Sequence, residues 1–148
     1  MVLLSWLKNR FKIAQELSFG DWLIITEAWW GLLAYYFAVR TVSFERLNRS
    51  DLVAETQANE AIVKKALHIH RLVYLASRLH ILSMTCLPRT LALRWVLRRR
   101  GMPAKVKIGV TKSQHGFQAH AWLELNGQQV GETEKVTERF RTFNFQGD

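Results

Sequence analysis

Residues 86–101 read CLPRTLALRWVLRRRG, and this stretch predicts a helix whose start and end are both marked. Pro88 suits the first helical position, because its missing N–H would be unpaired there anyway and its φ is already helical. The arginines at 98–100 complement the negative C-terminal end, and Gly101 can adopt the left-handed conformation that closes a helix. The helix therefore begins beside Cys86, the only cysteine of the chain.

A cysteine at a helix N-terminus is a candidate nucleophile. The free N–H groups and the partial positive charge there favour a thiolate over a thiol. His120 follows in the alternating run Phe117 to Leu125, and Glu132 lies twelve residues after His120. A cysteine on a helix N-terminus, a histidine on a following strand and an acid on the strand after the histidine is the order found in papain and in transglutaminases. We therefore predict Cys86 as nucleophile, His120 as base and Glu132 as the group that orients the imidazole.

The contact between His120 and Glu132 depends on the hairpin loop at Asn126-Gly127, a strong turn signal. A two-residue loop would place Thr133 opposite His120 and turn Glu132 to the other face of the sheet. A three-residue loop would place Glu132 directly opposite His120. We predict the three-residue loop, because only this loop brings an acid beside the imidazole, although a bulge near Gly131 would rescue the alternative.

Several local motifs around these residues resemble those of one family, the transglutaminase-like cysteine peptidases that remove leader peptides in lasso-peptide biosynthesis. The similarity is greatest to the stand-alone split form, whose leader-recognition domain is a separate protein, and it extends from Cys86 to about Phe140. The family usually has aspartate at the position of Glu132. The motifs are Cys86-Leu87-Pro88-Arg89, Ala119-His120-Ala121-Trp122-Leu123-Glu124, Asn126-Gly127 and Val136-Thr137-Glu138-Arg139-Phe140.

This resemblance implies a cysteine peptidase that cleaves the leader from a ribosomally synthesised lasso precursor through a thioester intermediate. It implies no cofactor. Its expected partners are the leader region of the precursor peptide, a separate leader-recognition protein and the ring-closing cyclase. Two alternatives remain open, namely a transamidase, which uses the same residues with an amine as acceptor, and a non-catalytic membrane-associated scaffold of a peptide-maturation complex.

The expected fold class is α+β. Alternating apolar residues over 106–110 and 117–125 predict strands. We expect N-terminal helices packed on a transglutaminase-like (papain-like) core of one helix and a small antiparallel sheet. The helical region would occupy residues 1–82 and the catalytic core residues 83–148, in one compact unit.

The N-terminal half has helical periodicity throughout. Residues 1–17 predict a short amphipathic helix, Ser18 with Asp21 predicts a capping box for a second helix, and Ser50 is a plausible cap for helical residues up to 82. Along this last segment Ile62, Ala66, Ile69, Val73 and Ala76 share one face.

Residues 22–39 contain a single charge, Glu27, in eighteen residues, which is near the lower limit for a membrane span. A charge at the centre of a span costs roughly 2.5–3.5 kcal/mol on insertion scales. Glu27, Gly31, Ala34 and Ala38 also recur at helical spacing as a small, polar face that suits close packing. We therefore expect a buried or membrane-surface helix in preference to a span.

The composition says more about the cellular location of the protein than about its binding partner. The chain has 148 residues and a net charge of +9, which suits an acidic peptide, an anionic membrane or nucleic acid equally well. No nucleic-acid partner is predicted, because the arginine run caps a helix and the tryptophans form no basic-aromatic strand motif. One cysteine permits no internal disulfide and fits the reducing cytoplasm. Contact with a membrane surface through residues 22–39 stays open beside this location.

The remaining histidines carry weaker signals. His68 and His70 are two residues apart and point to different sides of a helix, so we expect them on the surface or behind the site and predict no metal centre. His80 precedes the cysteine on another helix and is a poor candidate for the base. His115 falls in a polar, glycine-bearing loop.

Overall fold

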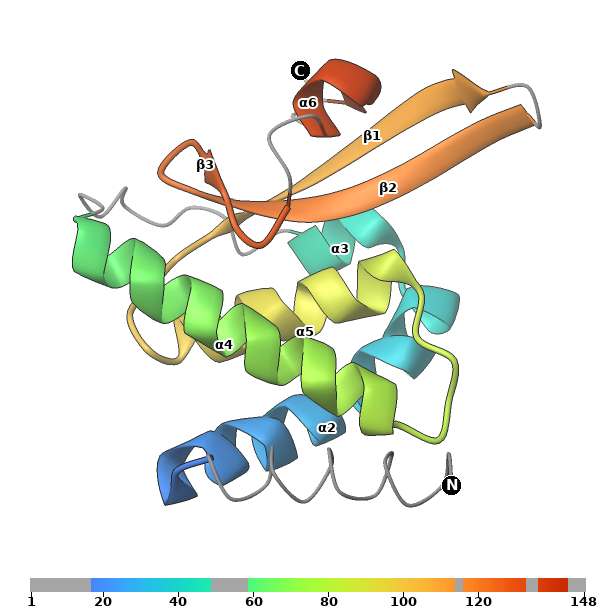
Figure 1. Cartoon of the computed structure of the whole chain (residues 1–148). Coiled ribbons are helices and arrows are strands. Elements are labelled where there is room, and N and C mark those ends of the chain that lie inside the picture. The colour runs from blue at the N-terminus through green and yellow to red at the C-terminus, as the bar shows by residue number, and fades with distance from the viewer. Residues whose placement is uncertain (1–16, 49–58, 114–115, 133–135, 144–148) are drawn as a thin grey trace, which may run out of the picture.

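The computed structural model describes residues 17–48, 59–113, 116–132 and 136–143. A layer of helices lies against one side of an antiparallel sheet, so the expected α+β class is confirmed (Figure 1). The helix expected over residues 1–16, the cap at Ser50 and the loop residue His115 lie outside the described residues. The elements are α2 (Phe19–Thr41), α3 (Phe44–Asn48), α4 (Glu60–Leu79), α5 (Cys86–Arg98), β1 (Lys105–Ser113), β2 (Gly116–Leu125), β3 (Gln128–Gln129), α6 (Val136–Arg139) and β4 (Arg141–Phe143).

Helix α2 begins at the capping box that its sequence predicts. The N–H of Asp21 donates to Ser18 Oγ over 3.2 Å, and the N–H of Ser18 donates to Asp21 Oδ2 over 2.9 Å. The buried residues of α2 are Ile25, Ala28, Gly31 and Leu32. Gly31 is buried as expected, but Ala34 is exposed, so the prediction for the packed face was wrong at that position.

The close approach of α2 to α5 explains this face. A Cβ atom on Gly31 would lie 3.0 Å from two ring carbons of Trp95. The carboxylate of Glu27 forms ion pairs of 2.7 Å with Arg99 and with Arg100. Two contacts with α5 therefore orient α2. The ring of Trp95 packs against Gly31, and the arginines that follow α5 pair with Glu27.

Within the described part of the chain, α2 is the helix that has the length and apolar composition to cross a membrane. A buried core helix or a signal sequence has the same properties, and 22% of the most apolar window is buried inside the protein. The aromatic side chains of Phe19, Trp30 and Phe37 on α2 are exposed. These residues give a weak indication of membrane association.

Helices α4 and α5 form the centre of the core. Ala66, Ile69, Val73 and Ala76 of α4 are buried, as their spacing predicts, and Asn59 caps the helix through its side chain. Helix α5 starts at Cys86, with Thr85 as the N-cap.

The start of α5 differs from the predicted one, whereas its end agrees with the prediction. Pro88 occupies the third helical position and not the first, because the helix starts two residues earlier than we expected. This shift places Cys86 at the first helical position, where it lies closest to the positive end of the helix. Gly101 has φ +72° and closes the helix as predicted.

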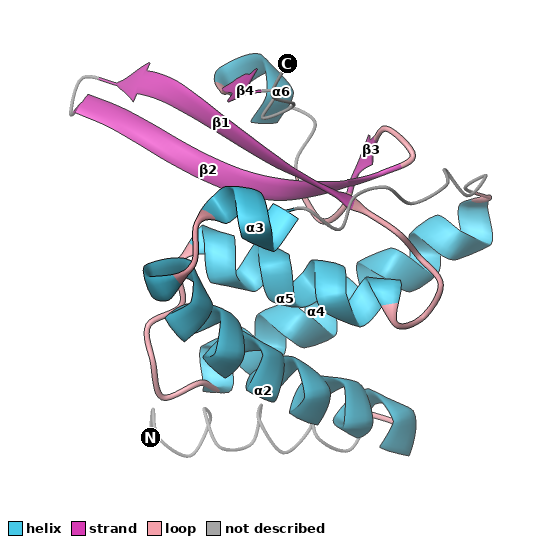
Figure 2. Ribbon diagram, turned by 180° about the vertical axis from the view of Figure 1, so that it is seen from behind, coloured by secondary structure: helices cyan, strands magenta, loops and turns pink. Residues whose placement is uncertain are grey.

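The sheet has the order β3-β2-β1-β4. Strands β1 and β2 form a long hairpin whose register runs from Lys105 opposite Glu124 to Ser113 opposite Gly116. Helix α5 packs against this hairpin near its base, and the tip of the hairpin projects past the helices (Figure 2). The middle of β2, around His120 and Ala121, is the part that faces the first turns of α5, where Thr90 Oγ1 donates to the carbonyl of Ala121.

Candidate active site

The loop between β2 and β3 has two residues, so the predicted three-residue loop was wrong. Leu125 pairs with Gln128 and Glu124 pairs with Gln129. Asn126 and Gly127 have φ values of +50° and +79°, which a two-residue loop of type I′ requires at both central positions. The Asn-Gly sequence supplies these conformations without a third residue.

Glu132 nevertheless reaches His120, by a different route from the one predicted. The N–H of Val130 donates to the carbonyl of Leu123 over 2.9 Å, and this is the last bond that the chain makes to β2 before it turns away. Gly131 has φ +77° at the turn. Glu132 Oε1 then lies 3.0 Å from His120 Nε2. The bend at Gly131, the position proposed for a bulge, thus brings the acid to the imidazole.

Aromatic side chains hold the imidazole of His120 from the other side. The ring centroid of Phe140 lies 5.5 Å from it and that of Trp122 lies 6.1 Å from it. A Cβ atom on Gly109 would lie 2.8 Å from the Cβ of Phe140 and 2.9 Å from the indole of Trp122. The glycine therefore gives these two side chains room to pack against the strand.

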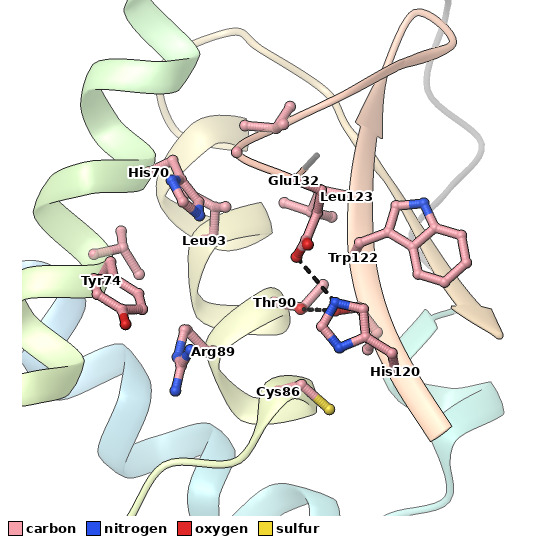
Figure 3. A pocket seen from close by; sticks show the side chains of 14 residues that line it. His70, Tyr74, Cys86, Arg89, Thr90, Leu93, His120, Trp122, Leu123 and Glu132 are labelled. Carbon is pink, nitrogen blue, oxygen red and sulfur yellow. Dashed lines mark hydrogen bonds and ion pairs between the residues drawn. The ribbon is translucent and has the colours of Figure 1, made fainter. Parts of the chain in front are cut away.

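The pair formed by His120 and Glu132 is half-buried, with side-chain exposures of 29% and 27%. Such a position screens the interaction between carboxylate and imidazole less than a fully solvated one would. Because Nε2 of His120 binds Glu132, the other ring nitrogen, Nδ1, is available, and it points toward Cys86 in Figure 3.

Cys86 and His120 line the same cavity, which has a volume of about 280 Å³. Its walls come from α4, from the first turns of α5, from β2 and from the segment after β3 (Figure 3). Cys86 is a free, half-buried cysteine. Thr85 makes no side-chain capping bond, so it leaves the first N–H groups of α5 to other partners. The structure thus brings all three predicted residues, Cys86, His120 and Glu132, to one cavity.

The wall of the cavity opposite β2 contains His70, which we had expected on the surface or behind the site, and Tyr74, which the sequence analysis did not single out. His70 and Tyr74 of α4 line it, with ring centroids 6.4 Å apart. Burial lowers the pKa of His70; the charge of Glu132 acts against this shift, and Arg89 and Arg71 reinforce it. The signal for this wall was the i, i+4 spacing of an imidazole and a phenol on one helix face.

Two other histidines, His68 and His80, do not line this cavity. His68 Nε2 lies 2.7 Å from Asp21 Oδ1, at the exposed start of α2. His80 stacks on Trp29, with ring centroids 4.5 Å apart. Among the described residues, no group of three or more potential ligands could hold a metal ion.

Arg89, one helical turn after Cys86, was also missed. Its Nη2 donates to the carbonyl of Met84 over 3.0 Å, and its guanidinium lies 5.1 Å from the ring centroid of Tyr74. Its Nε is buried and has no hydrogen-bond partner among the described residues. Arg89 therefore ties the loop before Cys86 to α5 and adds a positive charge to the cavity.

The side chains of the cavity are of the types that acyl transfer uses. The cavity contains a thiol at a helix N-terminus, an imidazole with one nitrogen held by a carboxylate, and room for a substrate group between them.

Comparison with known proteins agrees with this geometry. The model of the transglutaminase-like superfamily matches residues 31–144, which include α5, the sheet and the whole cavity. Neither the curated proteins nor the solved structures gave a significant match. Because the family model covers well over half of the sequence, the chain belongs to the transglutaminase-like superfamily.

Proposed function

We propose that this protein is a cysteine peptidase that removes the leader from a ribosomally synthesised lasso precursor peptide. The observation that carries the proposal is the placement of Cys86, at the start of α5, in the same cavity as the hydrogen-bonded pair His120 and Glu132. The motif resemblance supports the lasso precursor as substrate.

In the first half of the reaction, His120 Nδ1 takes the proton of the Cys86 thiol. The sulfur attacks the scissile carbonyl carbon, a C–S bond forms, and the carbonyl electron pair moves to oxygen. When this pair returns, the C–N bond breaks and the imidazolium of His120 gives its proton to the leaving amine. Glu132 holds the ring orientation and stabilises the imidazolium throughout.

In the second half, water attacks the thioester and gives its proton to His120. The C–S bond breaks, the imidazolium of His120 returns its proton to the departing thiolate, and the leader leaves with a new carboxylate. The backbone N–H of Cys86 would stabilise the oxyanion in both halves, because a first-turn N–H has no partner within its own helix.

The partners follow from the same resemblance. A separate recognition protein would deliver the leader, and a cyclase would close the ring of the released core peptide. The cytoplasm suits a chain that depends on a reduced thiol. The exposed aromatic residues of α2 support contact with a membrane surface, and co-sedimentation with anionic vesicles would test this contact.

Cleavage of a purified lasso precursor in the presence of its recognition protein tests the proposal. Mass spectrometry should show a leader with a free carboxylate and a core peptide with a free amine. Cys86→Ala and His120→Ala should abolish both products while the melting temperature stays near that of the wild type. His68→Ala, which changes a histidine outside the cavity, is the matched control and should retain cleavage. Full activity in Cys86→Ala would refute the peptidase.

Addition of hydroxylamine to the same reaction separates hydrolysis from transamidation. A peptidase should yield mainly the leader carboxylate, with a minor hydroxamate from capture of the thioester. A transamidase should yield amine adducts as its main product, and this outcome would replace the proposed hydrolysis.

A further inference from the structure

Strand β2 has an edge that its neighbours cover only at one end. Strand β3 pairs with Glu124 and Leu125, and Val130 adds one bond at Leu123. Nearer the hairpin tip, the described residues provide no strand beside this edge of β2.

The alternation of an antiparallel ladder identifies the backbone groups on this edge. Neighbouring residues of a central strand direct their N–H and C=O groups to opposite sides. The carbonyl of Leu123 accepts from Val130, and the carbonyl of Ala121 accepts from Thr90 Oγ1 over 3.0 Å. By the same alternation, the N–H and C=O of Ala119 and Phe117 point to this side, whereas those of His120 point to β1.

This edge leads directly into the cavity. Ala119 and Ala121 flank His120, and Ala121 itself lines the cavity beside Cys86. The outer part of the edge lies on the projecting hairpin (Figure 2), where Ala119 is exposed and Phe117 is 81% exposed. The edge thus runs from the solvent-exposed part of the hairpin to the cavity that contains the Cys86 thiol.

The sequence of this part of β2 does not protect its edge. Natural edge strands are commonly blocked by lysine, proline or inward charges, because an open edge pairs with other chains. Residues 116–121 read GFQAHA and contain neither lysine nor proline, whereas β1 on the same hairpin carries Lys105, Lys107 and Lys112.

We propose that the edge formed by residues 117–121 binds the substrate peptide as an added, extended strand. The N–H and C=O groups of Phe117 and Ala119 and the N–H of Ala121 would pair with the peptide backbone and direct the scissile bond to Cys86. This inference rests on the proposed peptidase function. The occupant is a peptide because the edge ends at the two groups that perform acyl transfer.

A scan of N-methylated substrates tests the pairing without any change to the protein. A strand added to an edge directs every second N–H toward the enzyme. Methylation at those positions should lower kcat/KM by about tenfold or more, because it removes a hydrogen bond and blocks close approach. Methylation at the intervening positions should change kcat/KM by less than about threefold. Losses that do not alternate along the peptide would overturn the inference.

A proline substitution tests the same edge from the side of the enzyme. Ala119→Pro removes an N–H that points to the open edge and spares the bonds to β1, which is the position where strands tolerate proline. In the Cys86→Ala background, fluorescence anisotropy should show peptide binding weakened by about fivefold or more.

Lys112→Pro is the matched control for Ala119→Pro. Its N–H lies on the opposite edge of the same hairpin, beyond the end of β4. This variant should bind the peptide within about twofold of its parent, and equal losses in both proline variants would contradict the proposal. If Ala119→Pro does not fold, the N-methyl scan still decides. Cleavage without alternation refutes the added strand alone, whereas the absence of any cleavage of the unmodified peptide refutes the peptidase.

Discussion

The backbone of Gly131 lies against the imidazole of His70, and a Cβ atom at this position would overlap the ring. Gly131 also has φ +77°, a conformation that residues with a side chain rarely adopt. Two independent constraints therefore require glycine at the bend that turns Glu132 toward His120.

Replacement of this glycine should damage the site more than the fold. Gly131→Ala should lower kcat/KM by about a hundredfold, because the bend must open and Glu132 then loses His120. Gly127→Ala is the matched control, since Gly127 has φ +79° but no atom within 4 Å of the added Cβ. The control should lose only about 1–2 kcal/mol of unfolding free energy in urea. Equal activity in the two variants would show that contact with His70 is unimportant, and Gly131→Ala combined with His70→Ala should recover part of the loss.

The charge of Glu132 should matter more than its length. Glu132→Gln keeps the shape of the side chain but removes the charge that stabilises the imidazolium, so kcat/KM should fall by about 10²- to 10⁴-fold. His120→Ala should cost more than this. Glu132→Asp should retain most activity, because the leader peptidases that this sequence resembles usually have aspartate at this position. Steady-state cleavage measures all three variants, and a nearly silent Glu132→Gln would assign the orientation of His120 to another group.

His70 should make the fold less stable in mild acid. Burial lowers its pKa below the usual 6.5, so between these two values the unfolded chain binds a proton that the folded chain does not. Above pH 6.5 the protonation of His70 therefore contributes nothing to the free energy of unfolding. As the pH falls from 6.5 toward the lowered pKa, the free energy of unfolding decreases. Urea unfolding at several pH values should show a smaller acid loss in His70→Gln than in the wild type.

The contact between α2 and α5 should be sensitive to volume. Gly31→Leu would force the new side chain into the ring of Trp95 and should destabilise the protein by about 1–3 kcal/mol. Ala34→Leu, one turn further along the exposed side, should change stability by less than about 0.5 kcal/mol. Thermal unfolding measures both variants. An unchanged melting temperature in Gly31→Leu would mean that α2 does not pack closely on α5.

Local signals predicted the elements of this fold well, because caps and turns are encoded within a few residues. Ser18 with Asp21 starts α2, Gly101 closes α5, and the Asn126-Gly127 turn joins β2 to β3. The loop length was wrong because we required Glu132 to reach His120 through the ladder.

Long-range packing accounts for what the sequence did not reveal. Whether Ala34 is buried depends on the angle at which α2 meets α5, and no residue near Ala34 encodes that angle. His70 faces the cavity because α4 packs against α5, and its local spacing indicated only a helix face. The bend at Gly131 was recognisable as a special position, but its contact with His70 arises from residues sixty-one positions apart.

The shortness of β3 has a consequence for engineering this protein. A longer β3 would satisfy more backbone groups of β2 and should raise the melting temperature. The same extension would occupy the edge beside Ala119 and draw Glu132 into the ladder, on the face away from His120. Selection for heat resistance alone should therefore favour variants that replace Gly131 and lengthen this strand. Such variants would have a higher melting temperature but no catalytic activity.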